Sequence, residues 1–209
     1  RTGGRCGRQP RPPGPVPAMK KAAAIVTGVQ NCATTHVLFS DADLSVPPIF
    51  FEMAVLLLNE FDVAISSRHL PGSKLLRRQP WLREHCGEIF RLGVRRFFLT
   101  TVSDFTCGLK AFKTEVAKKL FDGLVCLDWT FDVEVLLRAR QANLRIAEFP
   151  VDWNNRPDSR VRLIQAIFGS LLSLIKLHRT YGCRVEIQTI YSEVFWKFDF
   201  SFLLCRPAD

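Results

Sequence analysis

The sequence predicts an α/β fold, in which a sheet is flanked by helices. Short apolar runs, such as HVLFS at 36–40 and DVAIS at 62–66, alternate with longer helical segments and end next to polar residues. That alternation is typical of a sheet whose strand ends line a cleft. The chain has 209 residues, 47% of them hydrophobic and 23% charged, which is sufficient for one globular domain with a core.

The helices and strands are expected in a definite order. An Ala-rich helix at 19–33 precedes the run at 36–40, which we expect to be a buried parallel strand because it ends abruptly in acid. Proline favours the first turn of a helix, so Pro47 and Pro48 begin a helix that runs to residue 59. The remaining elements are a strand at 62–66, a cationic loop at 67–83, a helix at 81–99, a strand at 109–112, a helix from Thr114, a helix at 131–141 and a strand at 145–151.

Positive charge is concentrated at the N-terminus. The formal net charge is +9, but residues 1–21 carry six basic side chains and no acidic one. The other 188 residues hold 23 basic and 20 acidic side chains, a net charge of +3. The body of the protein is therefore only mildly basic, and its charge does not indicate a nucleic-acid-binding protein.

The N-terminal segment 1–17 contains five prolines and four glycines, a composition that predicts a disordered tail. It lacks the apolar core of a secretory signal and begins with Arg, so we expect a processed or incomplete chain. The seven cysteines are scattered singly without a CxxC pair, which is typical of free thiols in a reducing compartment.

Asp41 and Asp43 follow the strand at 36–40 and, two residues apart in an extended chain, point the same way. Two neighbouring carboxylates repel each other unless a cation lies between them. Mg²⁺ and Mn²⁺ prefer oxygen ligands and often complete their shell with substrate phosphates, so the pair is a candidate metal and nucleotide-diphosphate site. The alternative is that both residues only form a turn and cap the helix after Pro47.

Basic side chains gather in the expected loop at 67–83. Arg68 directly follows the strand at 62–66, and Lys74 and Arg77 lie further along. Such cations at a strand end can bind phosphate oxygens of a donor or acceptor, and a solvated basic loop is the alternative. Lys110, in the strand at 109–112, is either another phosphate contact or an exposed strand residue.

The helix at 131–141 begins with two acids. Asp132 and Glu134 are separated by about 200° around a helix, so only one of them can point into the cleft. Asp132 lies in the first turn, where the helix dipole favours an acid, and it is a candidate catalytic residue. Glu134 is spaced to pair with Arg138. Cys107 has no adjacent His or basic residue, which disfavours a nucleophilic role.

Apolar residues recur every three or four positions between 163 and 175, with basic residues on both sides. Crossing a bilayer takes roughly 20 apolar residues, so this run is too short to span one. We expect residues 161–183 to form an amphipathic helix that either lies on a membrane surface or packs on the sheet. The aromatic tail at 184–209 has no assignment.

Five sequence blocks occur in a recognisable order. They are HVLFSDADLSVPP at 36–48, AISSR at 64–68, DFTCGLKAF at 104–112, WTFDVEVL at 129–136 and IAEFPVDW at 146–153. Over roughly residues 19–178, the chain resembles the family 2 glycosyltransferases that load sugars onto polyprenyl phosphates, such as dolichyl-phosphate β-glucosyltransferases and dolichyl-phosphate mannose synthases. Several ordered blocks are far more specific than any one alone.

The resemblance implies a GT-A-like, Rossmann-like nucleotide-diphospho-sugar transferase domain at 18–160 that lacks its N-terminal part. It implies transfer of a hexose, with inversion, from a nucleotide sugar to a polyprenyl or dolichyl phosphate. Glucose from UDP-glucose is the expected donor, and mannose from GDP-mannose is the alternative. A third possibility is a non-catalytic remnant that binds a membrane or a partner.

The resemblance also assigns roles to individual residues. Asp41 and Asp43 would hold Mg²⁺ or Mn²⁺. Asp104 is similar to the active-site aspartate near the sugar and acceptor phosphate, where it either orients the acceptor or acts as a base, and a capping role before Gly108 is the alternative. The expected location is a membrane surface with the catalytic domain on the cytosolic side, at the endoplasmic reticulum in a eukaryote.

Overall fold

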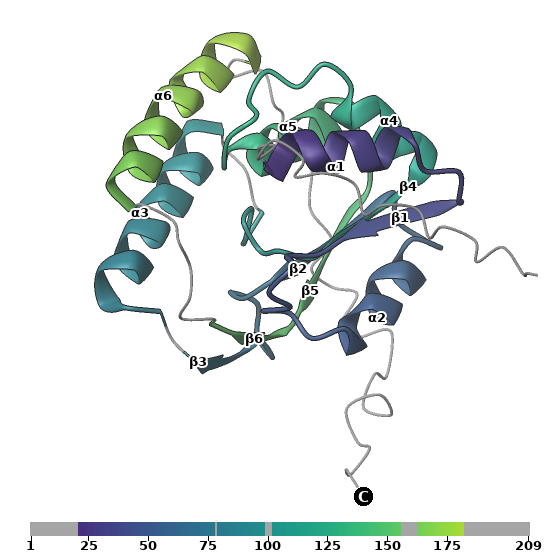
Figure 1. The fold of residues 1–209 in the computed structure, drawn as a ribbon, viewed down its shortest axis with the longest axis horizontal. Coiled ribbons are helices and arrows are strands. Elements are labelled where there is room, and N and C mark those ends of the chain that lie inside the picture. Colours follow the sequence, from purple (N-terminus) through teal and green to yellow (C-terminus); the bar gives the residue numbers. More distant parts are fainter. Residues whose placement is uncertain (1–20, 78, 99–101, 156–162, 182–209) are drawn as a thin grey trace, which may run out of the picture.

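The computed structural model describes residues 21–77, 79–98, 102–155 and 163–181, and it confirms the predicted α/β class. A central sheet has helices on both faces, and a small second sheet lies beside it (Figure 1). The helices are α1 (Lys21–Gln30), α2 (Ile49–Leu57), α3 (Trp81–Phe98), α4 (Thr114–Phe121), α5 (Phe131–Gln141) and α6 (Leu163–Tyr181). The strands are β1 (His36–Phe39), β2 (Val63–Ser67), β3 (Lys74–Arg77), β4 (Lys110–Lys113), β5 (Ile146–Pro150) and β6 (Asp152–Asn154).

The central sheet has the strand order β1-β4-β2-β5. Alternate residues of β2 face opposite sides: Val63 and Ile65 join the core cluster formed with α1, α3, α4, α5 and α6, whereas Ala64 packs with α2. Because helices cover both faces, every residue of β2 is buried. A strand in this position has no polar face, which explains why its sequence is an unbroken apolar run.

The direction of the first strand differs from the prediction. β1 was expected to be a buried parallel strand, but it is half-buried and pairs antiparallel with β4. β4 also runs antiparallel to β2, and β2 and β5 form the parallel pair of the sheet. An apolar run of four residues carries no information on the direction of its partner, so the periodicity could not reveal that β4 lies between β1 and β2.

The expected uninterrupted loop at 67–83 is also wrong. Within it, residues Lys74–Arg77 form β3, which pairs in parallel with β6 (Asp152–Asn154). All four residues of β3 are exposed, so the strand lacks the apolar alternation that signals a half-buried strand. Its partner lies far along the chain, and only the folded protein brings the two segments together.

The helix predicted at 161–183 forms over Leu163–Tyr181 as α6. It lies beside α3 (Figure 1), and Leu174 and Leu177 pack into the core. In the part of the chain that the structure describes, no helix combines the length and apolar character needed to cross a bilayer. The predicted tails at 1–17 and 184–209 lie outside the described residues.

Candidate functional site

The candidate site lies at the edge of the central sheet where β1 and β2 end and β4 begins. Phe39 of β1 and Ile65 of β2 are both register partners of Lys110, and Ile65 is also the register partner of Glu148 in β5. Because β4 is antiparallel to its neighbours, the loop before it reaches the same edge as the C-terminal ends of β1 and β2. This topology explains why Asp41, Arg68, Asp104 and Lys110 lie near each other, although they are distant in sequence.

Asp41, directly after the first strand, is held by a lysine that the sequence did not single out. Lys21 Nζ in α1 lies 2.5 Å from Asp41 Oδ1, and both side chains are about one-third exposed. Burial alone would lower the pKa of Lys21, but the charges of Asp132 and Asp41 together raise it above its ordinary value. The carboxylate of Asp41 lies close above Gly108, where an added Cβ would overlap it.

Asp43 has a different environment from Asp41. It is exposed, and its Oδ1 accepts a hydrogen bond from the Ser45 backbone N–H at 2.9 Å. The Asp41 carbonyl accepts one from the Leu44 N–H, and Leu44 has a φ of +50°, which is unfavourable for a bulky side chain. The turn expected as an alternative therefore forms, and it holds both carboxylates at the end of β1.

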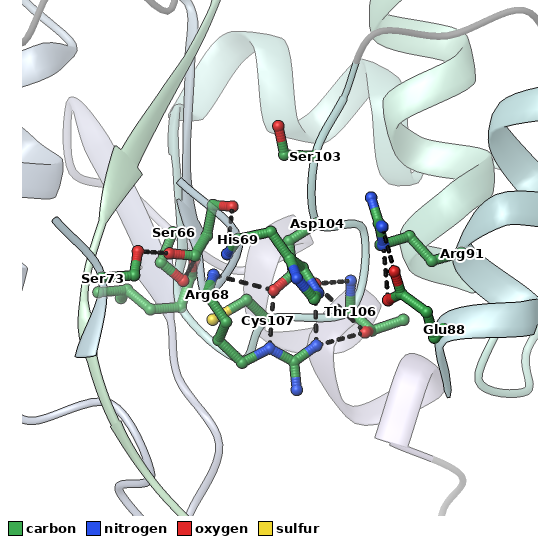
Figure 2. A network of polar contacts seen from close by, with 12 residues as sticks. Ser66, Arg68, His69, Ser73, Glu88, Arg91, Ser103, Asp104, Thr106 and Cys107 are labelled. Carbon is green, nitrogen blue, oxygen red and sulfur yellow. Dashed lines mark hydrogen bonds and ion pairs between the residues drawn. The ribbon is translucent and has the colours of Figure 1, made fainter. Parts of the chain in front are cut away.

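Arg68 and Asp104 form a buried two-point ion pair (Figure 2). Arg68 Nε donates to Asp104 Oδ2 at 2.7 Å, and Nη2 donates to Oδ1 at 2.9 Å. The Arg68 backbone N–H also donates to Oδ2, and the Thr106 N–H donates to Oδ1. Burial favours a neutral Asp104, but the Arg68 charge and these hydrogen bonds outweigh it and hold its pKa well below the ordinary range.

The guanidinium of Arg68 is oriented by groups beyond Asp104. Its central carbon lies 5.3 Å from the ring centroid of Trp153, and Nη2 also donates to Thr106 Oγ1 at 2.9 Å. Among the described residues, Nη1 has no hydrogen-bond partner, so this end of the group can bind a ligand. Burial opposes the charge of Arg68, yet Asp104 raises its pKa above the usual value, so it stays cationic.

Lys110 forms a second buried pair with Asp132 in the first turn of α5. Nζ lies 2.8 Å from Asp132 Oδ1 and also donates to the Cys107 carbonyl at 2.8 Å. The Lys110 side chain is 1% exposed, so the alternative of an exposed strand residue is wrong. Asp132 also influences the pKa of Lys21, which shows that this pair and the Lys21–Asp41 pair share one electrostatic environment.

Several candidate residues lie outside this cluster. Lys74 and Arg77 are on the exposed strand β3, and neither forms an ion pair with another described residue. Glu134 is buried and pairs with Arg138 at 2.7 Å, as its spacing predicted. It also accepts hydrogen bonds from the Val125 and Cys126 N–H groups and from Tyr181, so it fixes the start of α5 to α6.

The thiol of Cys107 is fully buried beside Asp104, and this burial raises its pKa to about 11. A thiol that stays protonated is a poor nucleophile, in agreement with the sequence argument. No three His, Cys, Asp or Glu side chains in the described ranges are arranged to hold a metal ion. Asp41 and Asp43 are two carboxylates near the end of β1, one paired with Lys21 and the other accepting a hydrogen bond from Ser45.

Comparisons with known proteins identify the family of the chain. Residues 18–121, about half of the chain, match the family model for glycosyl transferase family 2, and this range includes Asp41, Arg68, Asp104 and Lys110. The chain belongs to glycosyl transferase family 2. The match ends before α5, so the family model itself does not include Asp132 or Glu148.

Individual members of glycosyl transferase family 2 are similar to the chain. A glycosyltransferase of Haloferax volcanii is 36% identical over 110 residues, which cover 53% of this chain and 17% of that protein. Dolichyl-phosphate β-glucosyltransferases of Trichomonas vaginalis and Drosophila melanogaster are each 30% identical, covering 69% and 68% of this chain and 45% of each relative. The chain thus spans less than half the length of these family 2 relatives.

Two residues of the site were missed by sequence reasoning. Lys21 was counted only among the basic residues of 1–21 and given no role, although it begins the first helix and contacts Asp41. Glu148 was quoted in a motif without a role, although it is the one acidic residue in the apolar strand IAEFP. A charged residue in an otherwise apolar strand costs free energy unless it is paired, and that was the available signal.

Proposed function

We propose that the chain is part of a glycosyltransferase that moves a hexose from a nucleotide sugar to a polyprenyl or dolichyl phosphate, with inversion. The supporting observation is the meeting of Lys21–Asp41, Arg68–Asp104 and Lys110–Asp132 at one sheet edge, in a family 2 chain. The names of the relatives favour glucose as the transferred sugar, with UDP-glucose as donor.

The acceptor needs positioning more than activation. A phosphate monoester has a second pKa of about 6, so it is already an anionic nucleophile near neutral pH. Arg68 would bind it, or the donor diphosphate, through Nη1 while Asp104 and Trp153 hold the rest of the guanidinium. With the pKa of Asp104 held low and its oxygens occupied, we propose that Asp104 orients Arg68 and the acceptor, and does not accept a proton.

A divalent cation fits the carboxylates at the end of β1. We propose that Asp41 and Asp43 hold Mg²⁺ or Mn²⁺, which would neutralise charge on the leaving nucleotide diphosphate. Lys21 places a positive charge beside Asp41, and this charge would also attract the oxygens of a bound phosphate. The buried Lys110–Asp132 pair would hold one positive and one negative charge in place near the site. Lys74 and Arg77, exposed on β3, would bind phosphate oxygens that approach along this strand.

A membrane surface is the natural place for a lipid-linked acceptor. Large apolar side chains are exposed along α3 and α6, and basic residues accompany them on both helices. The apolar residues are Trp81, Leu82, Ile89, Leu92, Phe97, Leu171, Leu172 and Ile175, and the basic ones are Arg95, Arg96, Lys176 and Arg179. Such a surface suits the interface of an anionic bilayer, and we propose the cytosolic face of the endoplasmic reticulum in a eukaryote.

Transfer of radiolabelled sugar into organic-extractable lipid tests the proposal. The chain is incubated with dolichyl phosphate, Mn²⁺ and labelled UDP-glucose or GDP-mannose, and Asp43→Ala serves as the inactive comparison. Label from UDP-glucose that disappears in Asp43→Ala supports the proposal as stated. Label from GDP-mannose alone overturns the donor assignment, and no transfer from either donor by chain that still sediments with vesicles identifies a non-catalytic remnant.

A further inference from the structure

Glu148 is a buried acid on an outermost described strand of the central sheet, and the site described above assigns it no role. It lies in β5 beside Ile65 of β2, and 6% of its surface is exposed. Its Oε1 accepts hydrogen bonds from the backbone N–H of Ser103 at 2.8 Å and of Asp104 at 3.3 Å. Glu148 therefore contacts the backbone of the residue that holds Arg68.

The segment that Glu148 binds is not part of a helix or strand. Residues 102–109 contain no helix or strand, and they connect the end of the α3 region to β4. In this segment Asp104 must be placed so that both of its oxygens meet the guanidinium of Arg68, which comes from a different strand. A two-point contact depends on angle as well as distance, so a small rotation of the Asp104 backbone breaks it.

The surroundings make the charge of Glu148 costly. Burial is the main cause that raises the pKa of Glu148 to about 6, the hydrogen bonds from Ser103 and Asp104 act in the opposite direction, and the nearby Asp104 charge raises it further. No salt bridge joins Glu148 to a described cation. A hydrophobic side chain at this place in an apolar strand would avoid that cost, so the acid has a role other than packing.

We propose that Glu148 is the positioning residue of the site, which fixes the backbone at 103–104 by hydrogen bonding and thereby aligns Asp104 with Arg68. The role in catalysis rests on the proposed function, whereas the alignment itself does not. As an acceptor of two N–H groups, Glu148 acts through a carbonyl-like oxygen, and a neutral amide at the same place can supply that oxygen. The charged groups facing this cluster are Asp104 on the loop, Arg68 and His69 after β2, and Arg91 and Glu88 on α3.

The test compares Glu148→Gln, which keeps an acceptor oxygen, with Glu148→Leu, which removes it. The alignment is followed by NMR through the Nε–H resonance of Arg68, assigned by its loss in Arg68→Lys. We expect this resonance to stay at its wild-type position in Glu148→Gln and to shift to the position of a free guanidinium in Glu148→Leu. An unshifted resonance in a folded Glu148→Leu protein, or a lost one in Glu148→Gln, overturns the proposal.

Asp62→Asn is the matched control. Asp62 lies at the opposite end of β2, accepts the backbone N–H of Arg145 at 3.0 Å and pairs with Lys113. Its replacement is expected to lower stability without moving the Arg68 resonance. If Asp62→Asn moved that resonance as Glu148→Leu does, the effect would be general loosening of the sheet and the proposal would fail.

The Arg68 resonance in Glu148→Gln keeps the test decisive if Glu148→Leu does not fold, and stability against pH gives an independent readout of the Glu148 environment. The folded-state pKa of Glu148 is raised to about 6 from 4.5, so the folded protein holds this proton longer and stability falls as pH rises through that window. Glu148→Gln removes this dependence. Relative to wild type, its folding equilibrium is expected to gain roughly 30-fold between about pH 4 and pH 7. If the folding equilibrium constant of Glu148→Gln relative to wild type were the same at both pH values, Glu148 would not have the buried environment described here.

Transfer activity separates the two proposals. If the chain transfers sugar, Glu148→Leu should lower kcat with a smaller effect on the donor KM, because alignment and not binding is lost, and Glu148→Gln should retain most of the wild-type rate. A wild-type kcat in Glu148→Leu would overturn the positioning role. If wild type shows no transfer, the proposed function fails, while the NMR and stability comparisons still decide the alignment.

Discussion

The carboxylate of Asp41 lies directly against the Cα of Gly108, with no room for a side chain between them. The two residues lie in loops next to different strands: Asp41 follows β1, and Gly108 precedes β4. The tightness of this contact follows from the antiparallel pairing of β1 and β4, which brings the two loops together at the sheet edge. Gly108 is therefore needed for close approach, although its backbone conformation is open to other residues.

Gly108→Ala should displace the Asp41 carboxylate and lower the proposed metal-dependent transfer. An added Cβ would overlap Asp41 Oδ2, so the Asp41 side chain, which is about one-third exposed, must rotate away. We expect transfer to fall at least tenfold while the protein stays folded, measured with the radiolabel assay and circular dichroism. Gly93→Ala is the control, since its added methyl meets no atom and lies in α3, where alanine favours the helix. Equal activity of the two variants would contradict the prediction.

Asp104→Asn should destabilise the protein in a pH-dependent manner. It leaves the buried Arg68 guanidinium without its counter-charge, a loss of about 3–5 kcal/mol near neutral pH. Since the pKa of Asp104 is depressed in the folded state, its stabilisation is present above the unfolded pKa and is lost as pH falls. Urea unfolding near pH 7 and below about pH 4 measures this, and the gap between wild type and variant should narrow in acid. A gap of constant size would show that the ion pair is not its source.

Lys110 and Asp132 should be strongly coupled in stability. Removing either partner alone, as in Lys110→Met or Asp132→Leu, leaves a buried charge and should cost about 3–5 kcal/mol. The double variant should recover most of that loss, because both charges are gone and the apolar side chains fill the same space. Denaturant unfolding of the four proteins measures the coupling. Additive losses would contradict it, and a stable double variant without transfer would assign the pair to function.

Tyr181 should ionise at higher pH than a free tyrosine. The main cause is burial, and the hydrogen bond to Glu134 adds to it and raises the pKa of the phenol above 10.0. The protein has two tyrosines, so Tyr191→Phe leaves Tyr181 as the single phenol, and its absorbance can be titrated. Glu134→Gln in that background should lower the pKa towards the ordinary value. Because the folded-state pKa is raised, stability should decline as pH increases past about 10.

Exposed apolar residues of α3 should govern binding to anionic vesicles. Trp81 and Ile89 are 71% and 70% exposed, so replacing both with Ser removes apolar surface without opening the core. We expect reduced co-sedimentation with phosphatidylserine-containing vesicles at equal melting temperature. Ile49→Ser is the control, because Ile49 is 61% exposed on α2, across the sheet from α3. A similar loss in the control would point to non-specific adsorption.

The sequence predicted the elements that carry their own periodic or apolar pattern. Residues 131–141 form α5 with the predicted bounds, and the runs predicted as strands at 62–66 and 145–151 became β2 and β5. Asp41 and Arg68 were proposed as metal and phosphate ligands because they follow such runs. Asp41 and Arg68 are both next to strand ends, and a strand end is a position that a short pattern can reveal.

What the sequence could not predict depends on contacts between distant segments. The antiparallel direction of β4 and the pairing of β3 with β6 leave no local pattern, because the partners are set by the whole sheet. The same holds for Lys21, whose role depends on α1 lying over the end of β1. Lys110 could not be placed for the same reason: whether a lysine in a four-residue strand is exposed or buried is decided by α5.

The order of the strands along the chain has a consequence for biosynthesis. β5 and β6 come last among the described strands, and they carry Glu148 and Trp153, which contact the Asp104 loop and the Arg68 guanidinium. While the chain emerges from the ribosome, Arg68 and Asp104 are made well before these two side chains. The nascent protein must therefore keep Arg68, Asp104 and the open edge of β2 in water until residue 153 has emerged, and a chain that stops before β5 would lack both contacts.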